Sequence, residues 1–166
     1  MMRTLLCLAL VVAACAREKP RAPVSAAERY AGTWDGRSVR DGSDSGVSYT
    51  LQMTASAEGV LSGTLAFTGV STPPIAVRTI ELTDSVLVFE IGPYESPTVH
   101  KEVVTRSEGH LAGDSLWGAY VMLPTAGGGV VPDMTTAQWK NAETQPNPGS
   151  EPIRGTFAAK RKAATP

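Results

Sequence analysis

The stretch Val47-Ser48-Tyr49-Thr50-Leu51-Gln52-Met53-Thr54 alternates strictly between apolar and polar side chains. Successive side chains of a β-strand point to opposite faces, so the alternation predicts a strand with one buried face and one solvated face. The turn residues Ala57-Glu58-Gly59 follow, and an apolar face recurs over residues 60–68. Together these two segments predict an antiparallel hairpin.

Further strands are predicted along the rest of the chain, separated by turn signals rich in Gly, Asp and Pro. They cover residues 75–82, 86–91, 98–106, 110–123, 134–142 and 153–161. Ser107-Glu108-Gly109 is interpreted as a hairpin turn, because its pattern repeats that of residues 57–59. The long segment 110–123 is interpreted as a strand that bends at Gly113 and Gly118.

Loops are predicted at residues 40–46, 124–133 and 144–152, which are rich in Gly, Ser and Pro. With eight or nine successive strands and no crossover helix, the sequence predicts an all-β fold, an antiparallel up-and-down β-barrel over residues 30–162. Residues 163–166 would form a C-terminal tail. A β-sandwich is the alternative, because regular turn spacing does not separate the two architectures.

An apolar stretch, Thr4 to Ala14, follows Met1-Met2-Arg3 at the start of the chain. A positive start, a short hydrophobic run and small residues at its end are typical of a secretory signal peptide. A helix of this length covers about 17 Å, less than the ~30 Å hydrocarbon core of a bilayer, so it is not expected to span a membrane. We therefore predict a signal peptide at residues 1–14.

The residues Val12-Ala13-Ala14-Cys15 resemble the lipobox of bacterial lipoproteins. The resemblance implies that Cys15 is the acylated mature N-terminus and anchors the domain in a membrane of the cell envelope, because two or more acyl chains anchor stably. Gram-negative lipoproteins retained in the inner membrane commonly carry Asp next, where this chain has Ala16. The resemblance thus implies the outer membrane, on its periplasmic or surface face. An ordinary cleaved signal followed by a cysteine is the alternative.

Residues 15–29 are predicted to comprise the lipidated N-terminus, a polar tether with prolines, and a short helical turn. The helical turn is expected at Ser25-Ala26-Ala27-Glu28, where Ser and Glu have the spacing of a capping box.

Charge and cysteine content narrow the possible partners. The formal net charge is -1 and no basic stripe runs along the chain, so nucleic acid is not an expected partner. Lys160-Arg161-Lys162 is interpreted as a solvated strand end. The two cysteines, Cys7 and Cys15, both lie in or beside the leader, so no disulfide is expected within the barrel.

No catalytic motif is recognisable. Gly42-Ser43-Asp44-Ser45-Gly46 places Asp where a nucleophile elbow has Ser. His100 and His110 are predicted to flank the turn at 107–109, but no third ligand stands at a recognisable zinc spacing. Neither a metal nor another cofactor is therefore expected, and enzymatic activity is not predicted.

The motif Gly32-Thr33-Trp34 resembles the G-x-W opening of the calycins, the group that holds lipocalins and avidins. The resemblance implies that Trp34 plugs the closed end of the barrel and that a basic residue of the last strand, Arg154, packs over it. Short segments similar to avidins recur in order at residues 59–64, 117–121, 136–139 and 155–157.

Three positions depart from the avidin pattern. Gly36 and Leu65 stand where avidins place polar partners of the biotin ureido group, and Gly155 replaces an aspartate. Each buried polar group left without its partner would cost about 1–3 kcal/mol, so biotin is not the expected ligand.

Four aromatic residues are the candidate ligand contacts: Tyr49, Trp117, Tyr120 and Trp139. Aromatic walls with a few polar groups are typical of sites for small ligands. We therefore predict an envelope lipoprotein whose barrel binds a small apolar or amphipathic ligand. The alternative is an interaction module or structural protein of the envelope, whose barrel is filled by its own side chains and whose loops contact another envelope protein. An enzyme is the third possibility. A cavity of ~300 Å³ or more would favour the ligand.

Overall fold

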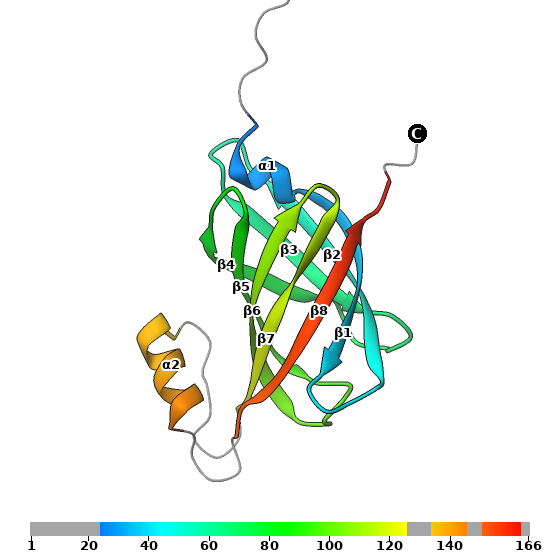
Figure 1. Ribbon diagram of the computed structural model, residues 1–166, viewed down its shortest axis with the longest axis vertical. Helices are drawn as coiled ribbons and strands as arrows, with labels where there is room; N and C mark the ends of the chain where they lie inside the picture. The colour runs from blue at the N-terminus through cyan, green and yellow to red at the C-terminus, as the bar shows by residue number, and fades with distance from the viewer. Residues whose placement is uncertain (1–23, 126–133, 146–150, 164–166) are drawn as a thin grey trace, which may run out of the picture.

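The computed structural model describes residues 24–125, 134–145 and 151–163, and these form a closed barrel of eight antiparallel strands in chain order (Figure 1). The strands are β1 (Gly32–Arg40), β2 (Gly46–Ala55), β3 (Leu61–Phe67), β4 (Ile75–Leu82), β5 (Val86–Glu95), β6 (Glu102–Ala112), β7 (Ser115–Pro124) and β8 (Ile153–Arg161). Two helices accompany them, α1 (Ala26–Tyr30) before β1 and α2 (Thr136–Thr144) between β7 and β8.

The barrel closes because the first strand pairs with both the second and the last. Trp34 of β1 lies opposite Leu51 of β2 on one side and opposite Arg161 of β8 on the other. The predicted up-and-down barrel is thus confirmed, and the sandwich is excluded. The predicted strand 75–82 coincides with β4.

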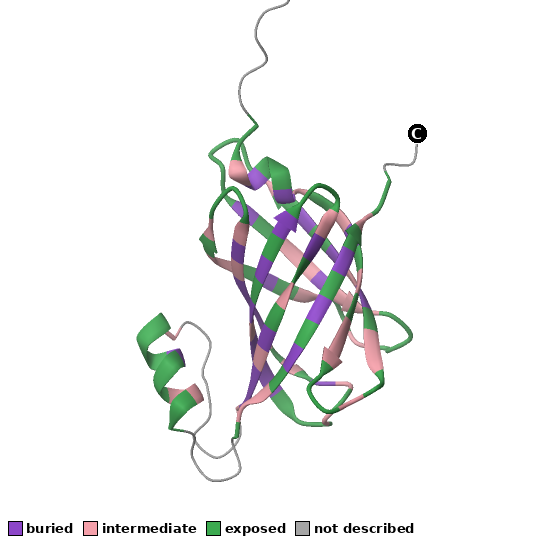
Figure 2. Cartoon of the chain, in the orientation of Figure 1, coloured by how far each residue is buried: buried purple, intermediate pink, exposed green. Residues whose placement is uncertain are grey.

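Burial alternates along the strands, as Figure 2 shows by the change of colour from one residue to the next. In β2, Tyr49, Leu51 and Met53 are at most 5% exposed, while their polar neighbours lie outside the core. The predicted apolar face of residues 47–54 therefore faces the barrel interior, where its burial removes apolar surface from water.

The predicted turn at Ser107-Glu108-Gly109 is wrong, because these residues lie in the middle of β6. Ser107 pairs with Phe89 of β5 and with Tyr120 of β7. The hairpin turn instead contains Gly113, whose φ is 56°. The predicted strand 110–123 is therefore the end of β6, a turn, and β7.

Residues 134–142 were expected to form a strand, but α2 occupies most of this segment. A capping box begins the helix. The Gln138 N–H donates to Thr135 Oγ1 at 3.2 Å, and the Thr135 N–H donates to Gln138 Oε1 at 2.9 Å. Such reciprocal bonds satisfy backbone donors that have no partner within the helix, which favours helix initiation at this position.

Trp34 is fully buried at one end of the barrel, and its Nε1 donates to the Tyr30 carbonyl oxygen at 2.9 Å. The Arg161 guanidinium lies 4.2 Å from the centre of the indole ring and donates to the carbonyl oxygens of Ala31 and Arg29. A basic residue of the last strand does cover the tryptophan, as expected, but that residue is Arg161. Arg154 lies near the other end of β8 and pairs with Glu143 of α2 at 2.5 Å.

We expect Arg161→Ala to lower the free energy of unfolding by about 1–2 kcal/mol, because it removes a cation–π contact and charge-assisted hydrogen bonds to α1. Arg154→Ala is the matched control, and losing its half-exposed ion pair should cost less than about 1 kcal/mol. Urea unfolding of both variants measures the difference, and equal losses would argue against the assignment of Arg161.

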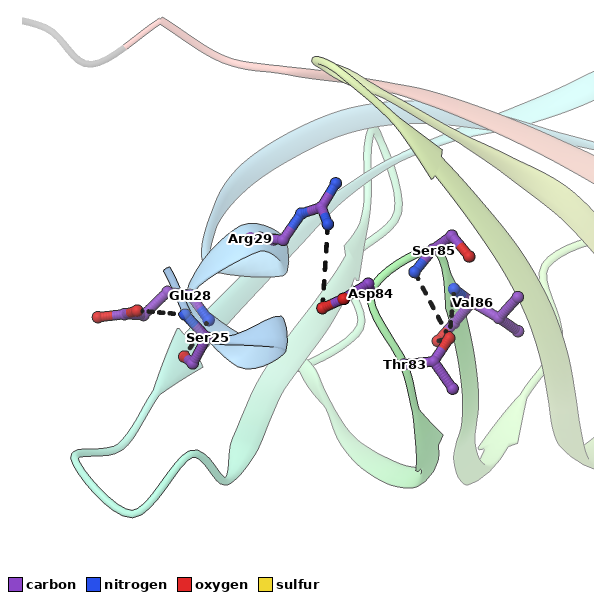
Figure 3. A network of polar contacts seen from close by, with 7 residues as sticks. All are labelled: Ser25, Glu28, Arg29, Thr83, Asp84, Ser85 and Val86. Carbon is purple, nitrogen blue, oxygen red and sulfur yellow. Dashed lines mark hydrogen bonds and ion pairs between the residues drawn. The ribbon is translucent and has the colours of Figure 1, made fainter. Parts of the chain in front are cut away.

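The helical turn predicted at residues 25–28 is confirmed by α1 and its capping box (Figure 3). The Ser25 N–H donates to Glu28 Oε2 at 2.7 Å, and the Glu28 N–H donates to Ser25 Oγ at 3.2 Å. Arg29 lies 3.9 Å from Asp84 in the turn between β4 and β5, so α1 contacts the rim of the closed end.

Within the described residues, no helix combines the length and the apolar composition needed to cross a bilayer. Several predicted features lie outside the described residues: the signal peptide, Cys7, Cys15, most of the tether, and most of the predicted loop 124–133.

Candidate functional site

The barrel interior contains a hollow, here called the cup, at the end away from Trp34. Its lining comes from every strand except β4 and from the turn after β5: Ser38, Val47, Tyr49, Leu65, Phe67, Phe89, Ile91, Tyr94, Ser96, Pro97, Thr98, Thr105, Ser107, Tyr120, Met122 and Phe157. The cavity volume is about 50 Å³. The cup is therefore a small space, largely filled by the side chains that line it.

Two glycines make room for two tyrosine rings of the cup. A Cβ on Gly36 would lie 2.6 Å from Tyr49 Oη, and a Cβ on Gly155 would overlap the Tyr120 ring. Gly36 is on β1 and Gly155 is on β8, and these strands are neighbours in the barrel. The two rings therefore lie over neighbouring strands but at different levels, because Gly36 lies opposite Ala159 and Gly155 lies opposite Arg40.

Hydroxyl groups are the polar component of the cup. Tyr94 Oη lies 2.8 Å from Thr105 Oγ1, and Ser96 Oγ lies 3.1 Å from Thr98 Oγ1. Tyr49, Tyr120 and Ser107 are 5%, 8% and 5% exposed as whole residues. Their hydroxyl oxygens are not among the fully buried side-chain atoms without a partner, which are Tyr30 Oη, Thr72 Oγ1, Glu90 Oε2 and Arg106 Nε. These three hydroxyls therefore border the open space of the cup, where a ligand or water can reach them.

No lining residue of the cup is an acid or a base. Burial raises the pKa of Tyr49 above the ordinary range for tyrosine and raises the pKa of Tyr94 to about 12. The pKa of Tyr120 is also raised, chiefly by burial and also by Asp41. All three phenols are therefore protonated at neutral pH, when each can donate a hydrogen bond.

We expect alkaline pH to destabilise the fold. The Tyr94 pKa is about 12 in the folded protein against a reference value of 10.0, so the unfolded chain loses this proton first. The stabilising contribution is fully present below pH ~10 and is lost as the pH rises towards ~12, at up to about 1.4 kcal/mol per pH unit for this group. Urea unfolding between pH 9 and 11.5 measures the slope.

Tyr94→Phe is the control for this pH dependence, because it removes one of the four tyrosines whose pKa is raised, Tyr30, Tyr49, Tyr94 and Tyr120. Its free energy of unfolding should fall less steeply with pH than that of the wild-type protein. A wild-type free energy that stays constant from pH 9 to 11.5 would contradict the prediction.

Two of the four predicted ligand contacts lie in the cup, Tyr49 and Tyr120. The other two lie outside the cup. Trp117 is 44% exposed on the outer wall, because the inward positions of β7 fall to Leu116 and Tyr120 and the period-2 alternation then turns position 117 outward. Trp139 belongs to α2 and is buried between this helix and the outer wall of the barrel.

Trp139 anchors α2 to the outer wall of the barrel. It packs in a cluster with the buried side chains of Val104 and Leu123, and the Arg106 guanidinium lies 5.2 Å from the centre of its ring. The helix therefore contributes a packed outer surface and no side chain to the lining of the cup.

Sequence reasoning missed the aromatic residues Phe67, Tyr94, Phe89 and Phe157 as site residues. Phe67 and Tyr94 approach at 5.6 Å between ring centres, and Phe89 and Phe157 form an edge-on pair at 6.1 Å. The available signal was strand parity, because Phe67 stands two residues beyond Leu65 on the apolar face of the predicted strand 60–68. Tyr94 was missed because Gly92-Pro93 suggested that the strand had already ended.

The two histidines do not come together. His110 is in β6 opposite Trp117, whereas His100 lies in the turn before β6 begins. Because Ser107–Gly109 continue the strand, the two side chains are at opposite ends of β6. Among the residues that the structure describes, no group of three His, Cys, Asp or Glu side chains could hold a metal ion.

Comparison with known proteins gives one structural similarity. No protein-family model matches the chain, and no curated protein matches it. Among solved structures, the chain is similar to the crystal structure of rhizavidin, with a TM-score of 0.43 and 13% sequence identity over 81% of this chain and 85% of that chain.

Proposed function

We propose that this protein binds a small apolar or amphipathic molecule in the cup. The observation that carries the proposal is a hollow with no charged residue in its lining, walled by aromatic rings and bordered by several hydroxyl groups. Sites for small molecules share this design, in which apolar walls supply burial and a few polar groups set orientation. Gly36 and Gly155 support the proposal, because they make room for two of the rings.

The size of the cup limits the ligand. An enclosed volume of about 50 Å³ is below the ~300 Å³ at the lower end of sites for drug-sized molecules. A bulky lipid therefore does not fit inside. Only a group of a few atoms fits the space as it stands.

Three methionine methyl groups can report where a ligand binds. Met122 lines the cup, Met53 packs near the closed end, and Met134 packs beside α2. We would label the full chain with ¹³C at the methionine methyl groups and titrate it with a panel of small uncharged aromatic compounds. The proposal expects the Met122 resonance to shift while the Met53 and Met134 resonances stay in place. Met122→Leu assigns the reporting signal.

A second candidate function is an interaction or structural module of the envelope with a side-chain-filled barrel. The small enclosed volume favours it, since a narrow barrel is filled by its own side chains. Native mass spectrometry of the purified protein separates the two functions. A co-purified small molecule supports binding in the cup, whereas an empty protein whose Met122 signal responds to no compound supports the module.

We also propose that the protein is lipid-anchored in the cell envelope through Cys15, with the outer membrane as its location. The lipobox-like residues 12–15 support this proposal, and they lie outside the described residues. The described domain begins with α1, so the intervening residues would act as the tether. Membrane fractionation compares the wild-type protein with Cys15→Ser, which should move to the soluble fraction. An equally soluble wild-type protein would refute the anchor.

A further inference from the structure

We propose that the outer wall of the barrel carries a second binding site, a groove beside Trp117 that takes a short acidic oligosaccharide. One sugar ring would stack on the exposed indole, and a carboxylate of the sugar chain would pair with Arg37. The groove is separate from the cup, and the inference does not depend on the function proposed for the cup.

Trp117 differs from the other exposed apolar side chains of the protein. Within the described part of the chain, the large apolar side chains that remain exposed are Val24, Val60, Val70 and Trp117. The three valines lie outside the strands, whereas Trp117 belongs to β7 and is 44% exposed. The helix α2 does not cover it, because α2 packs nearer the other end of β7, against Leu123. The indole is therefore available to a ligand on the outer wall.

The groove crosses the wall from β7 to β2 and has a volume of about 640 Å³. Trp117 lies opposite Ala158 of β8, which lies opposite Arg37 of β1. Arg37 in turn lies opposite Ser48 of β2. The side chain of Ala158 is a single methyl group, so it leaves a gap between the indole and the arginine. Three strand spacings span about 14 Å along the wall, which suits a short chain of sugar rings better than a single ring.

Polar side chains make up most of the remaining lining. They are Asp35, Arg37, Ser48, Thr50, Thr68, Ser115 and Lys160. A sugar ring presents C–H groups on its faces, which stack on an aromatic ring, and hydroxyl groups at its edge, which need hydrogen-bond partners. The groove offers both kinds of contact. A protein partner fits less well, because Lys, Asp and Ser are depleted in protein interfaces.

The charges in the groove favour an acidic sugar. Asp35 lies 3.8 Å from Lys162, so its charge is already balanced. Lys160 donates to the Ser115 hydroxyl. Arg37 is exposed, and its side chain makes no hydrogen bond or ion pair with another described residue. Its guanidinium is therefore available to a ligand, and its planar set of donors matches the geometry of a carboxylate.

The test titrates the full chain with trigalacturonate, a trisaccharide of acidic rings, and with its neutral methyl ester. The chain has three tryptophans, so three indole N–H resonances report the location of binding, and Trp117→Ala identifies the Trp117 signal. This signal should shift with trigalacturonate, while the Trp34 and Trp139 signals and the Met122 methyl resonance stay in place. Calorimetry should show the methyl ester binding about three- to fivefold more weakly, the effect of one exposed charge pair.

Two substitutions separate the role of the indole from the role of the charge. Trp117→Ala should weaken both trisaccharides at least about tenfold, because both stack on the ring. Arg37→Gln should weaken trigalacturonate about three- to fivefold and the methyl ester less than about twofold. Arg40→Gln is the matched control, an exposed arginine of the same strand outside the groove, and it should leave both affinities unchanged.

Unshifted Trp34 and Trp139 signals verify that each variant remains folded. Trigalacturonate that leaves the Trp117 signal in place, or that binds Trp117→Ala as tightly as the wild-type protein, would overturn the site. Equal losses of the acid and the ester in Arg37→Gln would overturn the preference for an acidic sugar. A shift of the Met122 resonance alone would locate the trisaccharide in the cup, which would overturn the groove and leave the function proposed for the cup standing.

Discussion

Trp34→Ala should lower the free energy of unfolding by about 3–5 kcal/mol, the range measured when a large aromatic side chain is removed from a core. The indole is fully buried, and its Nε1 donates to the Tyr30 carbonyl oxygen at 2.9 Å. Truncation therefore removes buried apolar surface, leaves a cavity and leaves that carbonyl without its partner. It also removes the ring beneath the Arg161 guanidinium.

Trp117→Ala is the matched control for this prediction, because it deletes the same side chain from the same barrel. Trp117 is 44% exposed on the outer wall, so its truncation should cost no more than about 1 kcal/mol. Urea unfolding at neutral pH measures both variants. Similar losses for the two would mean that Trp34 does not close the barrel as described.

The importance of Trp34 follows from the elements that meet there. Its strand pairs with β2 and β8, its ring nitrogen bonds to α1, and Arg161 connects the last strand to the carbonyl oxygens of Arg29 and Ala31. The first helix, the first strand and the last strand of the barrel domain thus all meet at Trp34. The G-x-W motif was sufficient to predict a buried role for Trp34.

To identify which basic residue covers Trp34, one needs the register of β8, and the sequence alone does not give this register. Both Arg154 and Arg161 belong to the last strand. Arg161 lies opposite Trp34, whereas Arg154 lies opposite Val121 towards the other end. Resemblance to a family predicted the type of residue, and only the strand pairing identifies which one.

Alternation and turn residues predicted most strands, because a half-buried strand must place apolar side chains at every second position. The same reasoning failed where a glycine served packing rather than a turn. Gly109 of β6 faces the interior of the barrel, where a Cβ would lie 3.1 Å from both the Leu116 and the Phe157 side chains. Ser107-Glu108-Gly109 therefore has the composition of a turn within a continuous strand.

The helix α2 had a signal that was available in the sequence. Thr135 and Gln138 have the same three-residue spacing as Ser25 and Glu28, and that spacing correctly predicted α1. For residues 134–142, a strand was predicted instead, because apolar and polar residues seemed to alternate there. The capping-box spacing is the more specific signal, because each member satisfies a backbone donor of the other.

The candidate site was only partly predictable, since a cup is defined by side chains from many strands. Tyr49 and Tyr120 could be nominated as aromatic residues, but their common surroundings depend on Gly36 and Gly155. From the sequence alone, the two glycines indicated only that polar side chains of the avidin pattern are missing at these positions. The structure gives them a positive role, since rings from the facing strands occupy the space that they leave.

Gly36→Ala should therefore destabilise the protein by about 1–3 kcal/mol, the range for overpacking a core. The three atoms nearest to a Cβ at position 36 all belong to the Tyr49 side chain, with Oη at 2.6 Å. The alanine methyl group would push this ring from its place on the wall into the cup. The backbone of Gly36 is not in the left-handed region, so the expected loss comes from the overlap with the ring.

A double-mutant cycle with Tyr49→Leu tests this cause, because leucine has no atoms at the position of the phenol ring. Tyr49→Leu alone should lower the free energy of unfolding because it removes buried apolar surface. The loss in the double variant should be smaller than the sum of the two single losses by about 1–2 kcal/mol. Additive losses would mean that Gly36 is required for another reason. With a positive coupling, Gly36→Ala should also change the response of the Met122 resonance to the uncharged aromatic compounds, because the displaced ring is part of the wall of the cup.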